Sequence, residues 1–86
     1  MKLFVANFPS ATEVRDLFRL FSRFGEVRGV SISWDRKTQE SRGWGFVEMA
    51  LNGDAESAID DLDGVLWRGK RLNVRKARPR HDQELR

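Results

Sequence analysis

The stretch RGWGFVEM, residues 42–49, has a composition that decides how it can sit in a β-sheet. Successive side chains of a strand point to opposite faces of the sheet. One face of this strand would carry Arg42, Trp44, Phe46 and Glu48, and the other would carry Gly43, Gly45, Val47 and Met49. Burying the aromatic side would draw two charged side chains into the core, where unpaired charges are rarely found. We therefore predict that both aromatic rings lie on an uncovered sheet surface, and an exposed apolar patch of this kind often marks a binding site.

The whole chain is small, positively charged and free of cysteine. Its 86 residues suffice for one domain with a modest core, and its formal net charge of +3 favours an anionic partner. The absence of cysteine excludes disulfides, thiolate metal sites and a cysteine nucleophile. The apolar runs are too short for a membrane span or a secretory signal, so we predict a cytoplasmic protein without membrane contact.

Hydrophobic periodicity places two helices and three more strands around the octamer. Alternation predicts strands, and apolar residues three to four positions apart predict helices. The expected segments are a strand over 2–8, a helix over 13–24 capped by Thr12 and ended by Gly25, a strand over 27–34, an exposed loop over 35–41, a helix over 52–63 ended by Gly64, and a strand over 71–77. The order is β-α-β-β-α-β.

This order predicts an α+β fold, a ferredoxin-like sandwich with a four-stranded antiparallel sheet and both helices on one face. In that topology the first and third strands are the central pair, which brings Phe4, Trp44 and Phe46 together on the helix-free face. Gly43 and Gly45 would lie under the helices, where close packing needs a missing side chain. A sheet with one covered face and adjacent aromatic rings on the other can stack unpaired nucleic-acid bases.

The same residues resemble the RNA-recognition-motif family. RGWGFVEM is similar to the octamer motif of that family, and LFVANF at residues 3–8 looks like its companion hexamer. The resemblance runs from about Lys2 to Ala77 and includes FSRFGEV, DRKTQES and LWRGKRLNV. Trp44 stands where Phe or Tyr is usual, and Met49 replaces an inward aromatic. The short length, GFVEM and the tail KARPR also resemble the single-domain members of the family from bacteria.

The resemblance implies a role for each matching residue. Phe4 and Phe46 match the positions on which the family stacks neighbouring bases. Trp44 matches the position that packs on a sugar or between two nucleotides, and Arg42 matches a residue that contacts backbone phosphate. The alternative is that each is a surface residue without a ligand.

Charged residues are unevenly distributed along the chain. Basic residues crowd the last strand and the tail, namely Arg68, Lys70, Arg71, Arg75, Lys76, Arg78 and Arg80, whereas Asp54, Glu56, Asp60, Asp61 and Asp63 crowd the second helix. We expect an electrically two-sided molecule in which the basic edge closes over a bound strand; a scattered, solvated basic edge is the alternative. The predicted RNA-binding residues are Phe4, Trp44, Phe46, Arg42, Lys2, Asn73, Arg75, Arg78 and Arg80.

Three classes of function are compatible with this sequence to different degrees. Binding of single-stranded RNA, in post-transcriptional control, explains the aromatic face, the basic edge and the motifs together; single-stranded DNA, or a general nucleic-acid chaperone role, is the alternative within this class. A protein-binding module would use Val14 and Phe18, which widen the apolar stripe of the first helix. An enzyme is least favoured, since the chain has one histidine, His81 in the tail, and no clustered carboxylates or phosphate-binding glycine loop.

The sequence therefore predicts a binding domain over residues 1–78 with a short basic and polar tail over residues 79–86. No catalytic residue, metal ligand or cofactor is expected. We expect a monomer, although the sequence leaves dimerisation open. Trp67 is predicted to pack in the core, and the sequence does not place Trp34.

Overall fold

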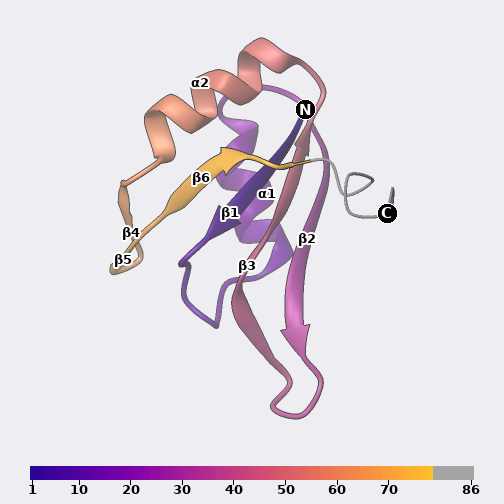
Figure 1. Cartoon of the computed structure of the whole chain (residues 1–86), viewed down its shortest axis with the longest axis vertical. Coiled ribbons are helices and arrows are strands. Elements are labelled where there is room, and N and C mark those ends of the chain that lie inside the picture. Colours follow the sequence, from indigo (N-terminus) through magenta and orange to yellow (C-terminus); the bar gives the residue numbers. More distant parts are fainter. Residues whose placement is uncertain (79–86) are drawn as a thin grey trace.

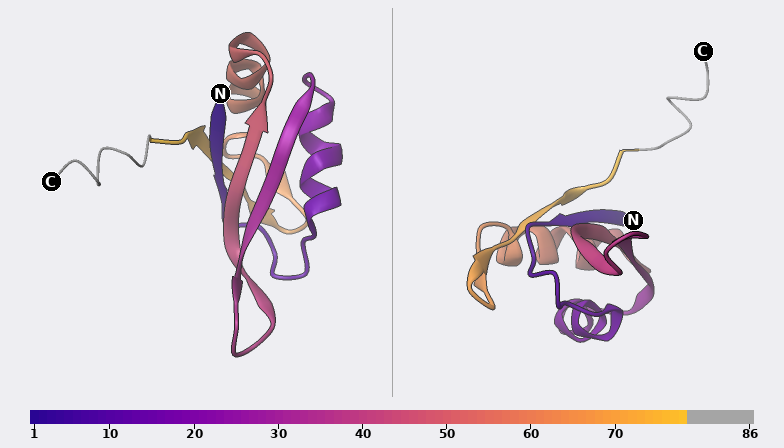
Figure 2. Two further views of the ribbon diagram at one scale, coloured as in Figure 1. Left: turned by 90° about the vertical axis from the view of Figure 1, so that its right-hand side faces the viewer. Right: turned by 90° about the horizontal axis from the view of Figure 1, so that it is seen from below.

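The computed structural model of the protein describes residues 1–78, which form a layer of strands and a layer of helices (Figure 1). In chain order the elements are β1 (Lys2–Ala6), α1 (Val14–Ser22), β2 (Val27–Asp35), β3 (Glu40–Met49), α2 (Asn52–Leu62), β4 (Leu66–Trp67), β5 (Lys70–Arg71) and β6 (Asn73–Lys76). Both helices lie on the same side of the sheet (Figure 2). The predicted α+β, ferredoxin-like fold is confirmed, with a small additional hairpin, β4–β5, before the last strand.

The main sheet has the strand order β2-β3-β1-β6, and every neighbouring pair is antiparallel. β1 and β3 are the central strands, as the topology predicts. Their register places Phe4 opposite Phe46 and Ala6 opposite Trp44. Since residues opposite each other in a sheet share a face, this register gathers the aromatic side chains on one surface.

The core lies between the sheet and the helices, on the other surface. Its members share the inward face of a strand or the apolar stripe of a helix, and they include Leu3, Val5, Val47, Met49, Leu72 and Val74 from the strands and Leu17, Leu20, Phe21, Ala55, Ala58 and Leu62 from the helices. Met49 is buried, so the residue that departs from the family pattern fills the core. Phe8, directly after β1, is also buried.

The start of α1 differs from the sequence prediction. The residue before the first turn is Glu13, not Thr12, and its backbone N–H donates to Asp16 Oδ2 at 2.8 Å. A carboxylate in the first turn satisfies one of the N–H groups that a helix leaves unpaired and interacts favourably with the helix dipole. The Thr12 side chain is buried instead, and the backbone N–H of Thr12 donates to the carbonyl of Pro9.

The two glycines of β3 permit two different close contacts. Gly45 is buried, and a Cβ there would collide with the carbonyl oxygen of Ser31 in the adjacent strand β2, next to a register shift between Ile32 and Trp34. Gly43 has φ +86°, a left-handed conformation that glycine adopts without strain. Gly45 shares the buried side of β3 with Val47 and Met49, as the alternation predicts, and its close neighbours are backbone atoms of β2. A Cβ at Gly43 would lie 3.3 Å from the carbonyl oxygen of Phe8.

The last predicted strand is divided in two. Residues 70–71 pair with β4 in the small hairpin, while residues 73–76 join the main sheet beside β1. The division falls at Leu72, whose N–H donates to the Val65 carbonyl at 2.9 Å and whose carbonyl accepts from Gly64. At the outer edge of the sheet, the Val74 N–H donates to Asp63 Oδ1 at 2.9 Å.

Within residues 1–78, neither helix has the length and apolar character needed to cross a membrane.

Candidate nucleic-acid interface

Three aromatic rings form one cluster on the uncovered face of the sheet. The centroid of the Phe4 ring lies 5.9 Å from that of Trp44 and 5.7 Å from that of Phe46, and the Trp44 and Phe46 centroids are 6.0 Å apart. The three rings are half-buried because they shield one another. The structure therefore brings together the three aromatic residues predicted from the sequence.

The residues around the cluster are small, which keeps the rings accessible. Phe46 faces Ser31 on β2, and the adjacent outward position on that strand is Gly29. Trp44 faces Ala6 on β1, and Ala6 in turn faces Asn73 on β6. Because these neighbouring positions carry small side chains, flat groups can approach the rings from solvent there.

Two shallow hollows flank the rings. One, of about 330 Å³, is lined by Phe4, Ala6, Asn7, Phe8, Arg42, Gly43, Trp44, Lys70 and Asn73. The other, of about 260 Å³, is lined by Lys2, Gly29, Val30, Ser31, Phe46 and Glu48. Each hollow has an aromatic ring in its wall and a cationic side chain at its margin. This combination suits a planar base attached to a phosphate.

Cationic side chains are placed directly beside the rings. The Lys2 ammonium lies 5.3 Å from the centroid of the Phe46 ring. Arg75 on β6 is the cross-strand partner of Phe4, and Arg42 lines the same hollow as Trp44. Glu48 is opposite Lys2 in the register, so the face also carries one carboxylate next to a cation.

Asn7 is a residue of this surface that the sequence analysis missed. It has φ 66°, its backbone N–H donates to the Gly43 carbonyl at 2.8 Å, and its side-chain Nδ2 donates to the Arg71 carbonyl at 2.7 Å. The side chain thus ties the end of β1 to the β4–β5 hairpin beside the hollow at Trp44. Asparagine tolerates the left-handed region better than most residues, which is the signal in LFVANF that could have identified this turn.

Other predicted residues lie elsewhere. Arg68 belongs to the helix side of the molecule, since its guanidinium bonds to Asp16 of α1; its assignment to the basic edge of the last strand is therefore wrong. Arg78 is exposed just after β6, and Arg80 lies outside the described residues, as does His81. Trp67 packs against the core, as predicted.

Two further predictions concern apolar side chains away from the aromatic face. Val14 and Phe18 are 44% and 47% exposed on α1, on the covered side of the sheet. Trp34 is 49% exposed near the tip of the β2–β3 hairpin, where it faces Ser41. These side chains are therefore not part of the aromatic cluster.

No group of three or more potential metal ligands occurs among the residues that the structure describes. The fold and this surface define a class of protein, the small α+β domains that present an aromatic sheet face to nucleic acid.

Comparison with known proteins identifies the family within that class. The family model described as RNA recognition motif matches residues 3–73, and the chain belongs to this family. Similar proteins from cyanobacteria are named RNA-binding proteins: RbpE of Nostoc sp. is 41% identical over 86 residues, covering 100% of this chain and 87% of its own, and RbpA of Synechocystis sp. is 37% identical over 83 residues, covering 96% and 82%.

Solved structures agree with this assignment. The crystal structure of RNA binding protein PG1 has a TM-score of 0.87 and 37% sequence identity, covering 92% of this chain and 98% of the other. A complex of the Sex-lethal protein with RNA has a TM-score of 0.85 and 37% identity, covering 91% and 47%.

Proposed function

We propose that this protein binds single-stranded RNA on the uncovered face of its sheet. The observation that carries the proposal is the cluster of Phe4, Trp44 and Phe46, whose ring centroids lie 5.7–6.0 Å apart on the two central strands. These three rings lie outside the buried core, so packing of the core does not explain their presence on this face. Unpaired bases stack on such rings, and base stacking tolerates any sequence because every base has a π-face.

The roles of the residues follow from their positions. Phe4 and Phe46 would each stack one base, and Trp44 would contact a base or sugar between them. Lys2 and Arg42 lie at the margins of the two hollows, where they would neutralise phosphates.

Beyond the rings, the proposed site continues along β6 toward the tail. Asn73 lines the hollow at Trp44, and its amide can both donate to and accept from a base edge. Arg75 faces Phe4 across the strands, and Arg78 and Arg80 would extend the basic path beyond the sheet.

One copy of the chain contains the complete set of rings and cations, so a single copy is our proposed RNA-binding unit, acting by binding rather than by catalysis. Relatives named RNA-binding proteins and the Sex-lethal complex with RNA support RNA as the ligand. A function in post-transcriptional control accords with such a ligand. The cytoplasmic location expected from the sequence stays a prediction.

The test is selection from a random pool of single-stranded RNA, repeated with single-stranded DNA. We expect enrichment of short unpaired RNA motifs by the wild-type protein and loss of this enrichment with a Phe4→Ala, Phe46→Ala double variant. An Arg36→Ala variant, changed in the β2–β3 hairpin away from the rings, is the matched control and should enrich the same motifs. If the double variant selects RNA as well as the wild type does, the aromatic face is not the binding surface. Stronger enrichment from DNA would reassign the ligand.

A further inference from the structure

A groove with a basic rim lies on the helix side of the molecule, away from the aromatic cluster. It separates α1 from the β4–β5 hairpin and has a volume of about 210 Å³. Its lining residues are Asp16, Arg19, Leu20, Arg23, Trp67 and Arg68. Three of these six side chains are arginines, so the groove offers a cationic surface above an apolar floor.

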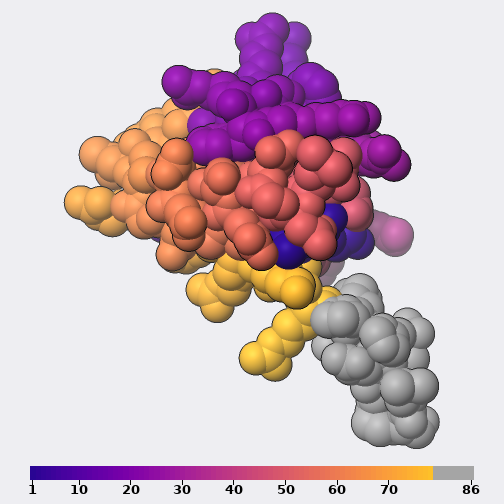
Figure 3. All heavy atoms as spheres, turned by 90° about the horizontal axis from the view of Figure 1, so that it is seen from above, coloured from indigo at the N-terminus to yellow at the C-terminus, as the bar shows by residue number. Residues whose placement is uncertain are grey.

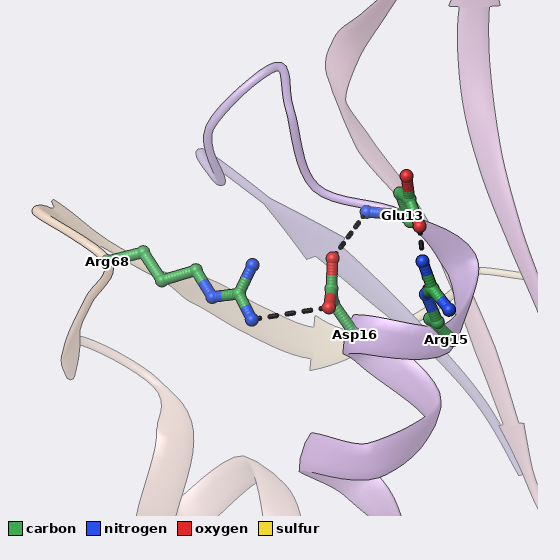
Figure 4. Close-up of polar contacts among 4 residues, drawn as sticks. All are labelled: Glu13, Arg15, Asp16 and Arg68. Atoms are coloured by element: carbon green, nitrogen blue, oxygen red, sulfur yellow. Dashed lines mark hydrogen bonds and ion pairs between the residues drawn. The ribbon is translucent and has the colours of Figure 1, made fainter.

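Arg68 is held across this groove by two contacts. Its guanidinium nitrogen Nη2 lies 3.2 Å from Asp16 Oδ1 (Figure 4). Its guanidinium carbon lies 4.6 Å from the centroid of the Trp67 ring. Arg19 of α1 and Arg23, the residue that directly follows α1, are four positions apart, and both are exposed. Neither forms an ion pair with another residue of the described chain. The groove is thus preorganised on one side and has two unneutralised cations on the other.

α2 presents the opposite charge on the same side of the sheet. It contains Asp54, Glu56, Asp60 and Asp61 and no lysine or arginine. Glu56, Asp60 and Asp61 are exposed, and within residues 1–78 none of them has an ion-pair partner. Figure 3 shows α2 in salmon and orange across one end of the molecule, between the purple residues of α1 and the segment after it and the yellow strand β6. The helix layer therefore displays an acidic strip and a basic groove side by side.

We propose that a second copy of this chain occupies the groove, in a two-fold pair in which the acidic α2 of each copy lies against the arginine groove of the other. A surface with adjacent strips of opposite charge is complementary to itself after a two-fold rotation, which matches each strip with its opposite twice. Within one copy the exposed carboxylates and the two free arginines do not pair. The outward positions Gly53 and Ser57 of α2 are small and exposed, so they let another surface approach closely.

This pair would leave both aromatic faces free, because the helices and the aromatic cluster lie on opposite surfaces of the sheet (Figure 2). Solvated ion pairs contribute little net affinity, so we expect a reversible pair that is sensitive to salt. Its formation needs no RNA. The pair should therefore form whether or not the protein binds RNA.

The test is sedimentation of the full chain without RNA over a range of protein concentrations. Wild-type protein should show a concentration-dependent shift toward twice its monomer mass at about 0.05 M ionic strength, and this shift should shrink at about 0.5 M, where the Debye length is a few ångströms. A wild-type protein that sediments as a monomer at every concentration and low salt overturns the proposal.

Charge reversal identifies the surfaces involved. We test two variants, Arg19→Glu, Arg23→Glu and Asp60→Lys, Asp61→Lys. Each should associate with itself at least about ten-fold more weakly, because its groove and its α2 then carry charge of the same sign. Mixed together, the two variants restore opposite charges at both contacts. The mixture should regain the association that each variant lacks.

An Arg36→Glu, Lys37→Glu variant is the matched control, since it makes the same change in net charge in the β2–β3 hairpin, away from the helices. It should associate as the wild type does. If the control weakens association as much as Arg19→Glu, Arg23→Glu, or if the mixture of helix variants stays monomeric, the pairing of α2 with the arginine groove is wrong. Circular dichroism shows whether each variant is folded. RNA affinity of the Arg19→Glu, Arg23→Glu variant is measured last. If this variant loses RNA affinity but still associates with itself, the groove binds RNA and not a second copy.

Discussion

Phe4 and Phe46 are direct cross-strand partners on the two central strands, and their ring planes are inclined at 61° with centroids 5.7 Å apart. This edge-to-face arrangement is a favourable geometry for two aromatic rings. It differs from a parallel stack, because the rings contact each other through an edge and leave flat surface toward solvent. The two rings are thus held in place by each other while remaining able to stack on a base.

Truncation of either ring on β3 should weaken RNA binding and leave the domain folded. Base stacking on an aromatic side chain contributes about 1–3 kcal/mol, so Phe46→Ala or Trp44→Ala should each raise the Kd by about ten-fold or more. Each truncation removes two ring–ring contacts, and each contact contributes about 0.5–1.5 kcal/mol to the free energy of unfolding in addition to the contribution of the buried area. Fluorescence anisotropy of a labelled single-stranded RNA measures the Kd of each variant, including the one that lacks Trp44, and urea unfolding measures the stability.

Phe21→Ala supplies the contrasting control. Phe21 is fully buried on α1, and truncating a buried aromatic costs roughly 3–5 kcal/mol of stability. The molecules that remain folded should bind RNA nearly as the wild type does. If Trp44→Ala instead unfolds the domain, or leaves RNA affinity intact, the aromatic face is not a binding surface.

The salt dependence of RNA affinity should report the basic residues at the end of the chain. Each phosphate neutralised on a single strand contributes a slope of about 0.7 to the dependence of log K on log salt. An Arg75→Ala, Arg78→Ala, Arg80→Ala variant should therefore show a shallower slope with all RNA sequences. Fluorescence anisotropy at several salt concentrations measures it, and a slope equal to that of the wild type would remove these arginines from the interface.

Phe18→Ser should leave RNA affinity unchanged. Phe18 is 47% exposed on α1, which lies on the covered side of the sheet, so the substitution removes no ring from the aromatic cluster. The same anisotropy titration checks this expectation. Loss of RNA binding by a variant that is still folded would mean that the RNA contacts the helices.

Gly45→Ala should destabilise the domain, because the new Cβ would collide with the Ser31 carbonyl in β2. Overpacking of this kind costs roughly 1–3 kcal/mol. Gly53→Ala on α2 is the matched control, since nothing lies within 4 Å of a Cβ at that position. Alanine is the better helix former by up to about 1 kcal/mol, so the control should be neutral or stabilising in urea unfolding. Equal effects of the two substitutions would contradict the close approach at Gly45.

The carboxyl group of Asp16 should titrate below pH 3.8, the ordinary pKa of aspartate. The Glu13 N–H that donates to this carboxylate lowers its pKa most, and Arg68 lowers it further. A lowered pKa in the folded state means that the ionised group adds stability above pH 3.8, and this contribution is lost as the pH falls through the folded value.

Carbon-detected NMR of the Asp16 carboxyl group measures this titration directly. Arg68→Ala should raise the midpoint only in part, because the bond from Glu13 remains. A midpoint above the ordinary value would show that the helix-start geometry is wrong.

The sequence predicted those features that depend on the alternation of side chains along a strand. The two-residue period of RGWGFVEM placed Trp44 and Phe46 on one face, and the order of elements paired their strand with that of Phe4. The structure confirms both predictions. They were possible because the charges of Arg42 and Glu48 leave the opposite face of the strand as the only favourable side for the core.

The features that the sequence did not predict depend on backbone conformation and on contacts between distant residues. Leu72 belongs to a run that alternates like a single strand, and only the pairing of its neighbours with β4 shows where that run divides. Arg68 follows the other basic residues in sequence, yet its partner Asp16 is 52 positions away. The turn between β4 and β5 determines both contacts, and the periodicity of the sequence does not predict where that turn lies.

The hydrogen bond from the Val74 N–H to Asp63 Oδ1 bears on how this protein avoids aggregation. β6 is an outer strand of the sheet, and the free N–H groups of an outer strand are a template on which another chain can add as a further strand. With this donor already occupied by a side chain of its own molecule, an incoming strand would lose one of the bonds that make such growth favourable. A carboxylate after the second helix thus removes one donor for strand addition at this edge of the sheet.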